Sequence, residues 1–434
     1  MIKLPKDVNE IIKTLNTNRF ECYAVGGCVR DAILGLKPLD WDLATNAKLE
    51  DLQKIFPEAK VLSEEYSVIR LDFTKTEDDD KNPIVDIATF RSERDFKNYG
   101  KPSDVHFVDT IEEDLKRRDF RINAMADNPQ KTFVDPYDGK KDINDRIIRV
   151  IGDPEVRFTE DPLRILRAIR FAAEKGFEIE ENTLEAMKKT AKLLNEISID
   201  KIRDEFIKIM GARFTGKGIE ILIDTDAIKV IVGDAISKLM PKKRVMFNKL
   251  IRNIDSTYPV AVRRMGLFFS AIGERNGHES IEKLNFDKKT KTYLLDAIYN
   301  IDKLGIVKKD FELKDFMYEY GLSRYTYMDK LAQDKVVVYN GSARRINKRA
   351  ELINRFEMMN EPIFAEDLVI DGNDLKEVGL KGEAIGAVID ALVTEIHRKP
   401  HRNNRQSLIE MANGYMKNPI KTKLRNNQWI KRLK

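Results

Sequence analysis

The sequence contains little cysteine and little histidine. Its 434 residues include two cysteines, Cys22 and Cys28, and four histidines. Two cysteines cannot build a disulfide framework, and such a low number is typical of proteins in a reducing compartment. Four scattered histidines do not suggest a His-rich metal site. We therefore expect a cytoplasmic protein without structural disulfides.

Long hydrophobic runs are also absent. No stretch of about 18 or more apolar residues occurs, so we expect no transmembrane helix and no membrane partner. The opening MIKLPKDVNE has no charged n-region followed by an apolar segment, so we expect no secretory signal. Apolar residues make up 42% and charged residues 34%, which is typical of a soluble globular chain. The length suggests about three units, each able to bury a core.

The small net charge of +5 conceals an uneven distribution. Residues 391–434 carry 11 Lys and Arg against 2 Glu, a net charge of +9, so the preceding 390 residues carry −4. A basic end on a mildly acidic body favours a polyanionic partner there. A solubilising tail is an equal alternative on this evidence alone. We find no sequence signal for an obligate protein partner.

The two parts of the chain differ in hydrophobic periodicity. Residues 22–25, 39–45, 68–73 and 84–90 have strand-like patterns, and residues 29–34 are helical up to Gly35. From about residue 155 the pattern is helical almost to the end, as in residues 160–176 and 183–197. The predicted fold class is α+β: a small mixed sheet with helices, followed by a long all-α region.

Two acidic residues stand two positions apart in the strand-like segment LDWDLAT. Asp40 and Asp42 share one face of such a strand, while Trp41 and Leu43 point to the other. Neighbouring carboxylates repel unless a cation neutralises them, and Mg²⁺ prefers such hard oxygen ligands. Asp86, in the segment IVDIATF, is a candidate third acid. A solvated sheet face is the more common explanation of such an Asp pair taken alone, and an edge-strand acid explains Asp86 equally well.

A glycine pair follows the first strand-like run. Gly26 and Gly27 let the backbone approach a ligand closely, and the helix that follows offers free N–H groups to an anion. Arg30, in the first helical turn, adds a charged donor. Tight turns without ligands are more frequent. This turn, however, lies about a dozen residues before the Asp pair, so both can contact one triphosphate.

A second helix carries three arginines on one stripe. In TEDPLRILRAIRF, Thr159 is the expected N-cap and Pro162 lies in the first turn. Arg164, Arg167 and Arg170 fall on one side at about 100° per residue, and Asp161 is close to Arg164 at i, i+3. A solvated face with an ordinary ion pair is the simpler explanation. Three arginines with no acid among them nevertheless call for an anion opposite.

The same segments carry a family resemblance. YAVGGCVRDAILGLKPLDWDLAT, DLKRRDFRINAMA, DPYDGKKDINDRIIRVIGDP, FTEDPLRILRAIRFAA and ISIDKIRDEFIKIM resemble, in order, the motifs of class II tRNA nucleotidyltransferases, which are the CCA-adding enzymes, and of bacterial poly(A) polymerases. They cover residues 20–210, with a weaker likeness in DLVIDGNDLKEVGLKGEAIG. The resemblance implies a catalytic head (1–150), a base-recognising neck (151–212), a body (213–350) and a tRNA-binding tail (351–434).

The resemblance also implies roles for particular residues. Asp40 and Asp42 match the Mg²⁺ ligands, and Asp86 matches the third catalytic acid less closely. The nucleotide-binding positions implied by the motifs and the turn are Gly26, Gly27, Arg30, Arg118, Asp161, Arg164, Arg167 and Arg170. Two departures concern nucleotide selection: Arg121 stands where the family usually has Thr, and residues 92–107 diverge from the family's loop between head elements.

The implied reaction is template-independent addition of C, C and A to a tRNA 3′ end from CTP and ATP, with pyrophosphate leaving. An RNA 3′-hydroxyl attacks the α-phosphorus, and two Mg²⁺ ions stabilise the attacking and leaving oxygens. We expect Asp161 and Arg164 to read the base edge. We also expect Lys421, Lys423, Arg425, Lys431 and Arg432 to hold RNA phosphates. Alternatives are addition of CC or A alone, poly(A) synthesis, and a catalytically silent RNA-binding protein.

Overall fold

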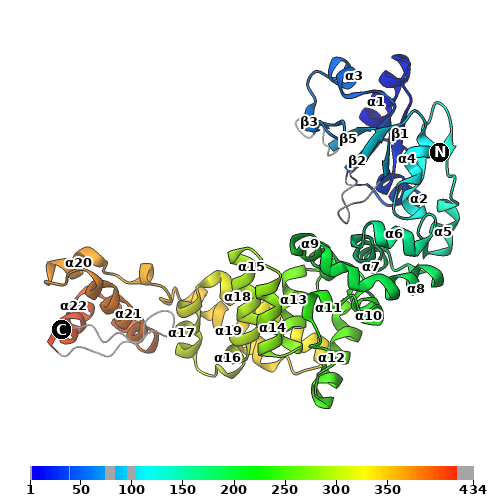
Figure 1. The fold of residues 1–434 in the computed structure, drawn as a ribbon. Coiled ribbons are helices and arrows are strands. Elements are labelled where there is room, and N and C mark those ends of the chain that lie inside the picture. Colours follow the sequence, from blue (N-terminus) through cyan, green and yellow to red (C-terminus); the bar gives the residue numbers. More distant parts are fainter. Residues whose placement is uncertain (1, 39, 74–83, 95–103, 418–434) are drawn as a thin grey trace. The chain divides into compact units, whose positions relative to one another are not determined.

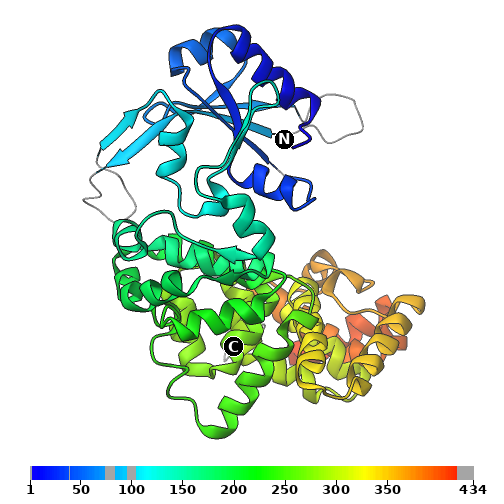
Figure 2. The ribbon, with the colours of Figure 1, turned by 90° about the vertical axis from the view of Figure 1, so that its right-hand side faces the viewer.

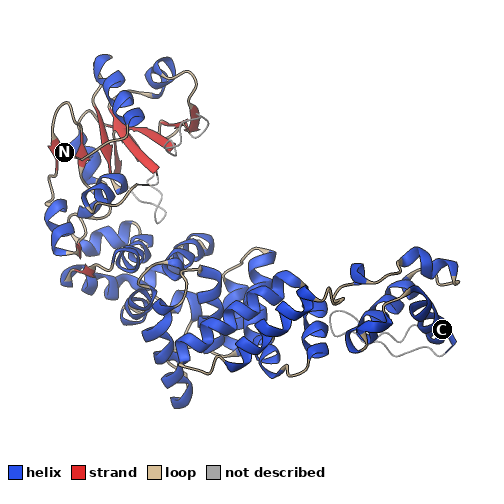
Figure 3. Cartoon of the chain, turned by 180° about the vertical axis from the view of Figure 1, so that it is seen from behind, coloured by secondary structure: helices blue, strands red, loops and turns tan. Residues whose placement is uncertain are grey.

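The computed structural model describes residues 2–38, 40–73, 84–94 and 104–417. The chain forms two compact units, residues 1–234 and 235–434, which we treat separately (Figure 1). All of the strands lie in the first unit (Figure 3), so the predicted α+β class is confirmed for the described residues. None of the helices in those ranges has both the length and the apolar content needed to cross a bilayer.

The head is built on a seven-stranded sheet in the order β3-β4-β5-β2-β1-β8-β9. Within this sheet β2 and β5 pair in parallel, and the other neighbours are antiparallel. The strands are β1 (Cys22–Val25), β2 (Asp40–Thr45), β3 (Lys60–Ser63), β4 (Val68–Asp72), β5 (Ile84–Thr89), β8 (Ala126–Asp127) and β9 (Phe133–Val134). The four strand-like segments found in the sequence are thus strands, and two of them, β4 and β5, pair antiparallel.

Period-two alternation decides which face of β2 is buried. Trp41 and Leu43 are 3% and 1% exposed and belong to the core, while Asp40 and Asp42 are exposed. Burial of the two apolar side chains sets the orientation of the strand, because a slip of one residue would turn both carboxylates into the core. The prediction that the acids share one face is therefore confirmed.

A separate ribbon of β6 (Arg91–Arg94) and β7 (Asp104–Phe107) pairs antiparallel beside the sheet (Figure 2). It contains the ends of the divergent loop at 92–107; residues 95–103 lie outside the described residues. The helices that accompany the head sheet are α1 (Lys6–Thr17), α2 (Gly27–Ile33), α3 (Leu49–Ile55), α4 (Ile111–Lys116) and α5 (Gly139–Asp145). Two further short strands, β10 (Ile147–Ile148) and β11 (Glu178–Ile179), pair in parallel.

The rest of the first unit is helical. Its helices are α6 (Pro154–Glu160), α7 (Leu163–Lys175), α8 (Glu181–Thr190), α9 (Ile199–Gly211), α10 (Thr215–Asp224) and α11 (Lys229–Val232). One side of α7 is apolar: Leu166, Ile169 and Ala173 are fully buried, and the helix packs against α9 and α10. The helix ends at Gly176, which adopts a left-handed conformation with φ 71°.

The predicted start of the arginine helix is wrong. Thr159 is in the last turn of α6 and does not cap α7, whose N-cap is Pro162. Asp161 is extended between the two helices, with φ −143° and ψ 93°. The physical reason is local, since a residue before proline is disfavoured in the helical region. The break places Asp161 at a corner and leaves its carboxylate outside both helices.

The second unit is helical throughout its described residues. Its helices are α12 (Pro241–Asn253), α13 (Ala261–Ala271), α14 (Glu274–Lys283), α15 (Lys288–Tyr299), α16 (Ile301–Ile306), α17 (Asp310–Tyr320), α18 (Leu322–Tyr339), α19 (Arg344–Met358), α20 (Gly372–Glu377), α21 (Glu383–Arg398) and α22 (Arg405–Lys417). Near its end Val388, Leu392 and Ile396, four residues apart on α21, point into one apolar cluster. The basic residues expected to bind RNA, Lys421, Lys423, Arg425, Lys431 and Arg432, lie outside the described residues.

Candidate active site

The glycine turn connects β1 to α2. Gly26 has φ 74° and ψ −129°, a conformation that disfavours any side chain, and its N–H donates to the carbonyl of Met125. A Cβ atom on Gly26 would lie 2.7 Å from the Arg118 guanidinium. Glycine is therefore required here for two reasons, the backbone conformation and the close approach of an arginine. Because α2 has only seven residues, nearby arginines supply most of the positive charge at this turn.

The acidic residues lie on two neighbouring strands. Asp42 of β2 is in register with Asp86 of β5, and both strands run in the same direction. Asp86 also accepts two hydrogen bonds from Arg70 of β4, at 2.7 and 2.8 Å. β5 lies between β4 and β2, so the alternative reading of Asp86 as an edge-strand acid is wrong. The sheet thus brings the third acid beside the pair, but Arg70 holds its carboxylate.

The environment of Asp42 suits a cation. Desolvation by the surrounding protein, together with repulsion from Asp86 and Asp40, raises the pKa of Asp42 although its carboxylate is still reached by solvent, and Arg118 and Arg70 offset only part of this. Asp40 and Asp42 offer exposed carboxylates on one face, which are ligands of the kind that Mg²⁺ prefers. The described residues contain no group of three or more His, Cys, Asp or Glu arranged to hold a metal. The donor set therefore fits an ion that takes its remaining ligands from substrate phosphates and water.

A cleft of about 460 Å³ opens beside Asp42 and the glycine turn. All eight residues predicted to bind the nucleotide line it, whereas Asp40 and Asp86 do not. The lining residues are Gly26, Gly27, Arg30, Asp42, Arg117, Arg118, Asp119, Asn123, Asp161, Leu163, Arg164, Arg167, Arg170, Phe171 and Lys201. Seven of these are basic and three are acidic, an excess that favours a polyanionic ligand. Segments separated by more than a hundred residues thus meet around one space.

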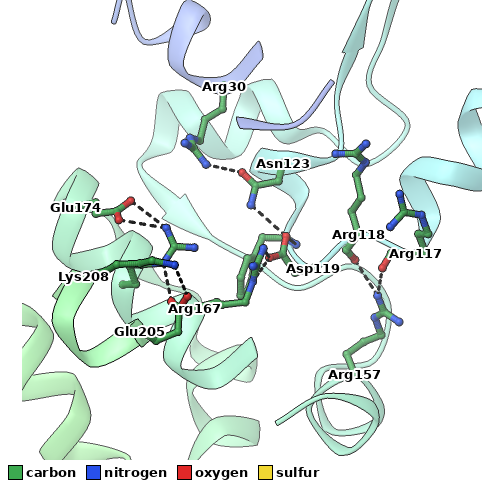
Figure 4. Close-up of polar contacts among 12 residues, drawn as sticks. Arg30, Arg117, Arg118, Asp119, Asn123, Arg157, Arg167, Glu174, Glu205 and Lys208 are labelled. Atoms are coloured by element: carbon green, nitrogen blue, oxygen red, sulfur yellow. Dashed lines mark hydrogen bonds and ion pairs between the residues drawn. The ribbon is translucent and has the colours of Figure 1, made fainter. Parts of the chain in front are cut away.

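A buried chain of hydrogen bonds crosses the cleft (Figure 4). Arg30 donates to the side-chain oxygen of Asn123 at 2.6 Å, and Asn123 donates to Asp119 at 3.0 Å. The Asp119 carboxylate also accepts two hydrogen bonds from Arg167, at 2.9 and 2.5 Å. Burial by itself would raise the pKa of Asp119, but Arg167 and the hydrogen bonds bring it well below its ordinary value. Asp119 therefore stays ionised and orients Arg167.

Phe171 forms an aromatic surface next to these arginines. The guanidinium of Arg170 lies 4.2 Å from its ring centre, that of Arg30 5.1 Å and that of Arg167 5.9 Å. Arg170 is held in turn by Glu205 of α9 at 2.7 Å. The ring of Phe171 is buried, so it fixes the directions of three cations at once.

Asp161 and Arg164, which we expect to read the base together, lie close to each other, because the N–H of Arg164 donates to the backbone carbonyl of Asp161 at 3.1 Å. Arg164 is 5% exposed, and its guanidinium donates to Glu160 at 3.1 Å and to the carbonyl of Arg157 at 3.0 Å. The Asp161 carboxylate accepts from the backbone N–H of Leu163 at 3.1 Å. The guanidinium of Arg164 thus pairs with Glu160, the residue before Asp161. Asp161 and Arg164 both line the cleft.

The anions opposite the three arginines include carboxylates of the protein itself. Each pairs with a carboxylate of the protein: Arg164 with Glu160, Arg167 with Asp119, and Arg170 with Glu174 and Glu205. Two of these acids, Asp119 and Glu205, come from other segments, so no local spacing in the sequence relates them to the arginines. The arginines are thus already oriented before any substrate arrives.

No argument from the sequence places Leu163, Phe171 or Lys201 in the cleft, which they also line. Phe171 lies four residues after Arg167, so its position one turn further along the same stripe was a usable signal. Lys201 is contributed by α9, and nothing in its local sequence indicates the cleft. Arg121, where the family usually has Thr, is not among the lining residues. Its charge acts on Asp142 of α5.

The sheet with its Asp pair, glycine turn and basic cleft defines a nucleotidyltransferase. Residues 22–149 match the poly A polymerase head domain family, and residues 176–237 match the family described as the probable RNA and SrmB-binding site of polymerase A.

Curated relatives extend this likeness over nearly the whole chain. The CCA-adding enzyme of Streptococcus suis (strain 05ZYH33) is 31% identical over 96% of this chain and 98% of its own. That of Ligilactobacillus salivarius (strain UCC118) is 30% identical over 93% and 94%. The crystal structure of the Bacillus stearothermophilus CCA-adding enzyme in complex with CTP superposes with a TM-score of 0.76 at 26% identity, covering 96% of this chain and 100% of that one. The chain belongs to the CCA-adding enzyme family.

Proposed function

We propose that the protein adds C, C and A to the 3′ end of tRNA, using CTP and ATP and releasing pyrophosphate. The observation that carries this proposal is one cleft in which Asp42 and the glycine turn lie beside Arg118, with Asp161 and Arg164 also in its wall. A nucleotide bound there has its triphosphate near the acids and its base near the neck. The family to which the chain belongs supports the same activity.

The triphosphate is bound at the head end of the cleft. Gly26 and Gly27 leave room for phosphate oxygens, and Arg30 and Arg118 supply charged donors. Asp40 and Asp42 would hold Mg²⁺, which would supply Lewis-acid stabilisation of the charge that develops in nucleotidyl transfer. The protein's own residues position the nucleotide and neutralise its charge, which is the main requirement of such reactions. No covalent enzyme intermediate is required.

The base is read by Asp161 and Arg164. An ionised carboxylate only accepts hydrogen bonds and a guanidinium only donates them. Cytosine and adenine each present an amino donor beside a ring-nitrogen acceptor, which matches this pair. Uracil and guanine present the reverse polarity and leave the buried groups unpaired, which can reduce incorporation by several orders of magnitude. Asp161 thus distinguishes C and A from U and G without a nucleic-acid template.

The parts of the chain divide this work. We assign catalysis to residues 1–150, base recognition to 151–212, a helical body to 213–350 and tRNA binding to 351–434, including Lys421, Lys423, Arg425, Lys431 and Arg432. We also propose a cytoplasmic location, supported by the free thiols of Cys22 and Cys28, both of which are buried.

The deciding experiment supplies purified protein with tRNA that lacks its 3′ end, with CTP, ATP or both, and sequences the products. CCA addition is the expected result, and it requires both nucleotides. Addition of CC or A alone, or long A tracts, would instead indicate a restricted enzyme or a poly(A) polymerase. A catalytically silent RNA-binding protein would release no pyrophosphate.

A further inference from the structure

Arg157 of α6 connects two segments of the cleft that lie about 40 residues apart. Its Nη2 donates to the carbonyl of Arg117 at 2.7 Å and to that of Arg118 at 2.8 Å (Figure 4). Its Nη1 pairs with the carboxylate of Glu160. The side chain is 13% exposed, so these contacts are largely shielded from water.

The neck end of this connection reaches the base-reading arginine by two routes. The Glu160 oxygen that pairs with Arg157 also accepts from Arg164 at 3.1 Å. The backbone carbonyl of Arg157 accepts from the same Arg164 nitrogen at 3.0 Å. A shift of Arg157 therefore moves both acceptors of Arg164 together.

The head end of the connection fixes the position of Arg118, the arginine proposed to bind phosphate. Arg157 holds the peptide oxygen of Arg118 itself, while the Arg118 side chain pairs with Asp114 at 3.0 Å and reaches Gly26. The next residue, Asp119, is held through its side chain by Arg167. The neck thus holds the turn at residues 117–119 through Arg157, Arg167 and the N–H of Ile151, which donates to the Asp119 carbonyl at 3.2 Å. Of these groups, Arg157 contacts the carbonyls of Arg117 and Arg118.

Only a guanidinium can make this set of contacts. Arg presents a planar fork of five donors, whereas the Lys ammonium is a single compact point. Burial and the neighbouring Arg164 guanidinium lower the pKa of Arg157, and no hydrogen-bond partner of its Nε lies among the described residues. The charged Arg157 guanidinium is thus buried at a cost in free energy, and its contacts connect two segments of the chain.

We propose that Arg157 is a positioning residue for nucleotide selection, which holds the phosphate-binding turn at 117–119 in register with Glu160 and Arg164. This proposal rests on the proposed function. CTP and ATP fit the cleft when the triphosphate and the base are bound at one fixed separation. Loss of this register leaves the triphosphate site complete, but the base is no longer held against its reading groups.

The test compares Arg157→Lys with wild type on tRNA lacking its 3′ end. The ratio of kcat/KM for CTP to that for UTP is expected to fall at least tenfold. Inhibition by inorganic tripolyphosphate, which probes the phosphate site alone, is expected to change less than threefold. Arg149→Lys is the matched control. Arg149 also pairs with two acids, Asp142 and Glu180, but lies outside the cleft lining, and both measurements should stay at wild-type values.

An unchanged CTP-to-UTP ratio in Arg157→Lys overturns the proposal. An equal loss of tripolyphosphate inhibition and CTP use also overturns it, since Arg157 would then support the phosphate turn alone. If Arg157→Lys does not fold, Glu160→Gln removes the neck end of the connection and must lower the ratio in the same way. Failure of the proposed function is seen separately: wild-type protein would then not extend the tRNA, or Asp161→Ala would discriminate as before.

Discussion

Arg167 of α7 holds the carboxylate of Asp119 with two hydrogen bonds, at 2.9 and 2.5 Å, across 48 residues of chain. Asp119 is 8% exposed and Arg167 is 38% exposed, so one partner is buried and the other reaches into the cleft. The pair attaches the arginine helix to the turn that carries Arg118. It therefore contributes to stability and to the geometry of the cleft.

Asp119→Asn is expected to destabilise the protein by about 2 kcal/mol, the range found for hydrogen bonds to charged groups. Partial exposure of Arg167 keeps the loss below that of a fully buried pair. Urea unfolding at pH 7 measures the change. Asp204→Asn, which alters an exposed pair with Arg203, is the control and should shift the free energy of unfolding by less than about 0.5 kcal/mol. Equal effects of the two substitutions would contradict the role given to Asp119.

The contribution of Asp119 depends on pH with a definite sign. Its pKa in the folded state lies below the unfolded value of about 4, so ionised Asp119 favours folding above pH 4. This stabilisation is lost as the pH falls below 4 toward the folded-state pKa. The difference in unfolding free energy between wild type and Asp119→Asn should therefore be constant from pH 7 to 5 and narrow below pH 4. A difference that widens at low pH would show that the sign is wrong.

Conversion of Asp40 and Asp42 to alanine should reduce nucleotide incorporation by at least about 10³-fold, because both proposed metal ligands are removed. Circular dichroism should remain that of wild type, since both side chains are exposed. Glu50→Ala, which removes an exposed acid of α3, is the control and should keep full activity. Extension of RNA at the wild-type rate by the double variant would refute the mechanism.

Asp86→Asn should lower activity less than Asp42→Asn does. Arg70 occupies both oxygens of Asp86 and Asp86 does not line the cleft, whereas Asp42 does. Single-turnover rates at saturating CTP and Mg²⁺ measure the two effects. If Asp86→Asn is the more damaging change, Asp86 must leave Arg70 during the reaction and act as a metal ligand itself.

Asp161→Ala should reduce the preference for CTP and ATP over UTP and GTP by at least about tenfold, because the acceptor for the amino group is removed. The rate of pyrophosphate release with mixed nucleotides distinguishes a change in nucleotide selection from a change in the rate of the chemical step. Glu185→Ala, which removes an exposed acid on α8, is the control. Discrimination as strict as in wild type would mean that another group reads the base.

Replacement of Lys421, Lys423, Arg425, Lys431 and Arg432 by glutamine should weaken tRNA binding at low salt and flatten its salt dependence. For every phosphate that the variant no longer neutralises, the slope of log K against log salt should fall by about 0.7 to 0.9. Replacement of the exposed head residues Lys48, Lys54 and Lys60 is the control and should leave the slope unchanged. An identical slope in the five-residue variant would assign the RNA contacts to other residues.

The sequence alone predicts those features that depend on local periodicity and on individual residue types. The alternation around Trp41 and Leu43 places Asp40 and Asp42 on one face, and the glycine pair after β1 predicts a tight turn, at which Gly26 adopts a positive φ of 74°. Such features follow from a few neighbouring residues, because strand period and backbone freedom are local properties.

Only the tertiary structure determines which charged side chains form ion pairs. Arg167 pairs with Asp119, Arg170 with Glu205, and Arg70 with Asp86, each across two separate segments. The periodicity of the sequence does not predict these ion pairs, because they depend on how helices and strands pack. The pairing of Glu160 with Arg164, four residues later, also depends on the break before Pro162, which leaves Glu160 at the end of α6 facing the guanidinium. Packing brings the separate segments together, and so it determines how the arginines of the cleft are held.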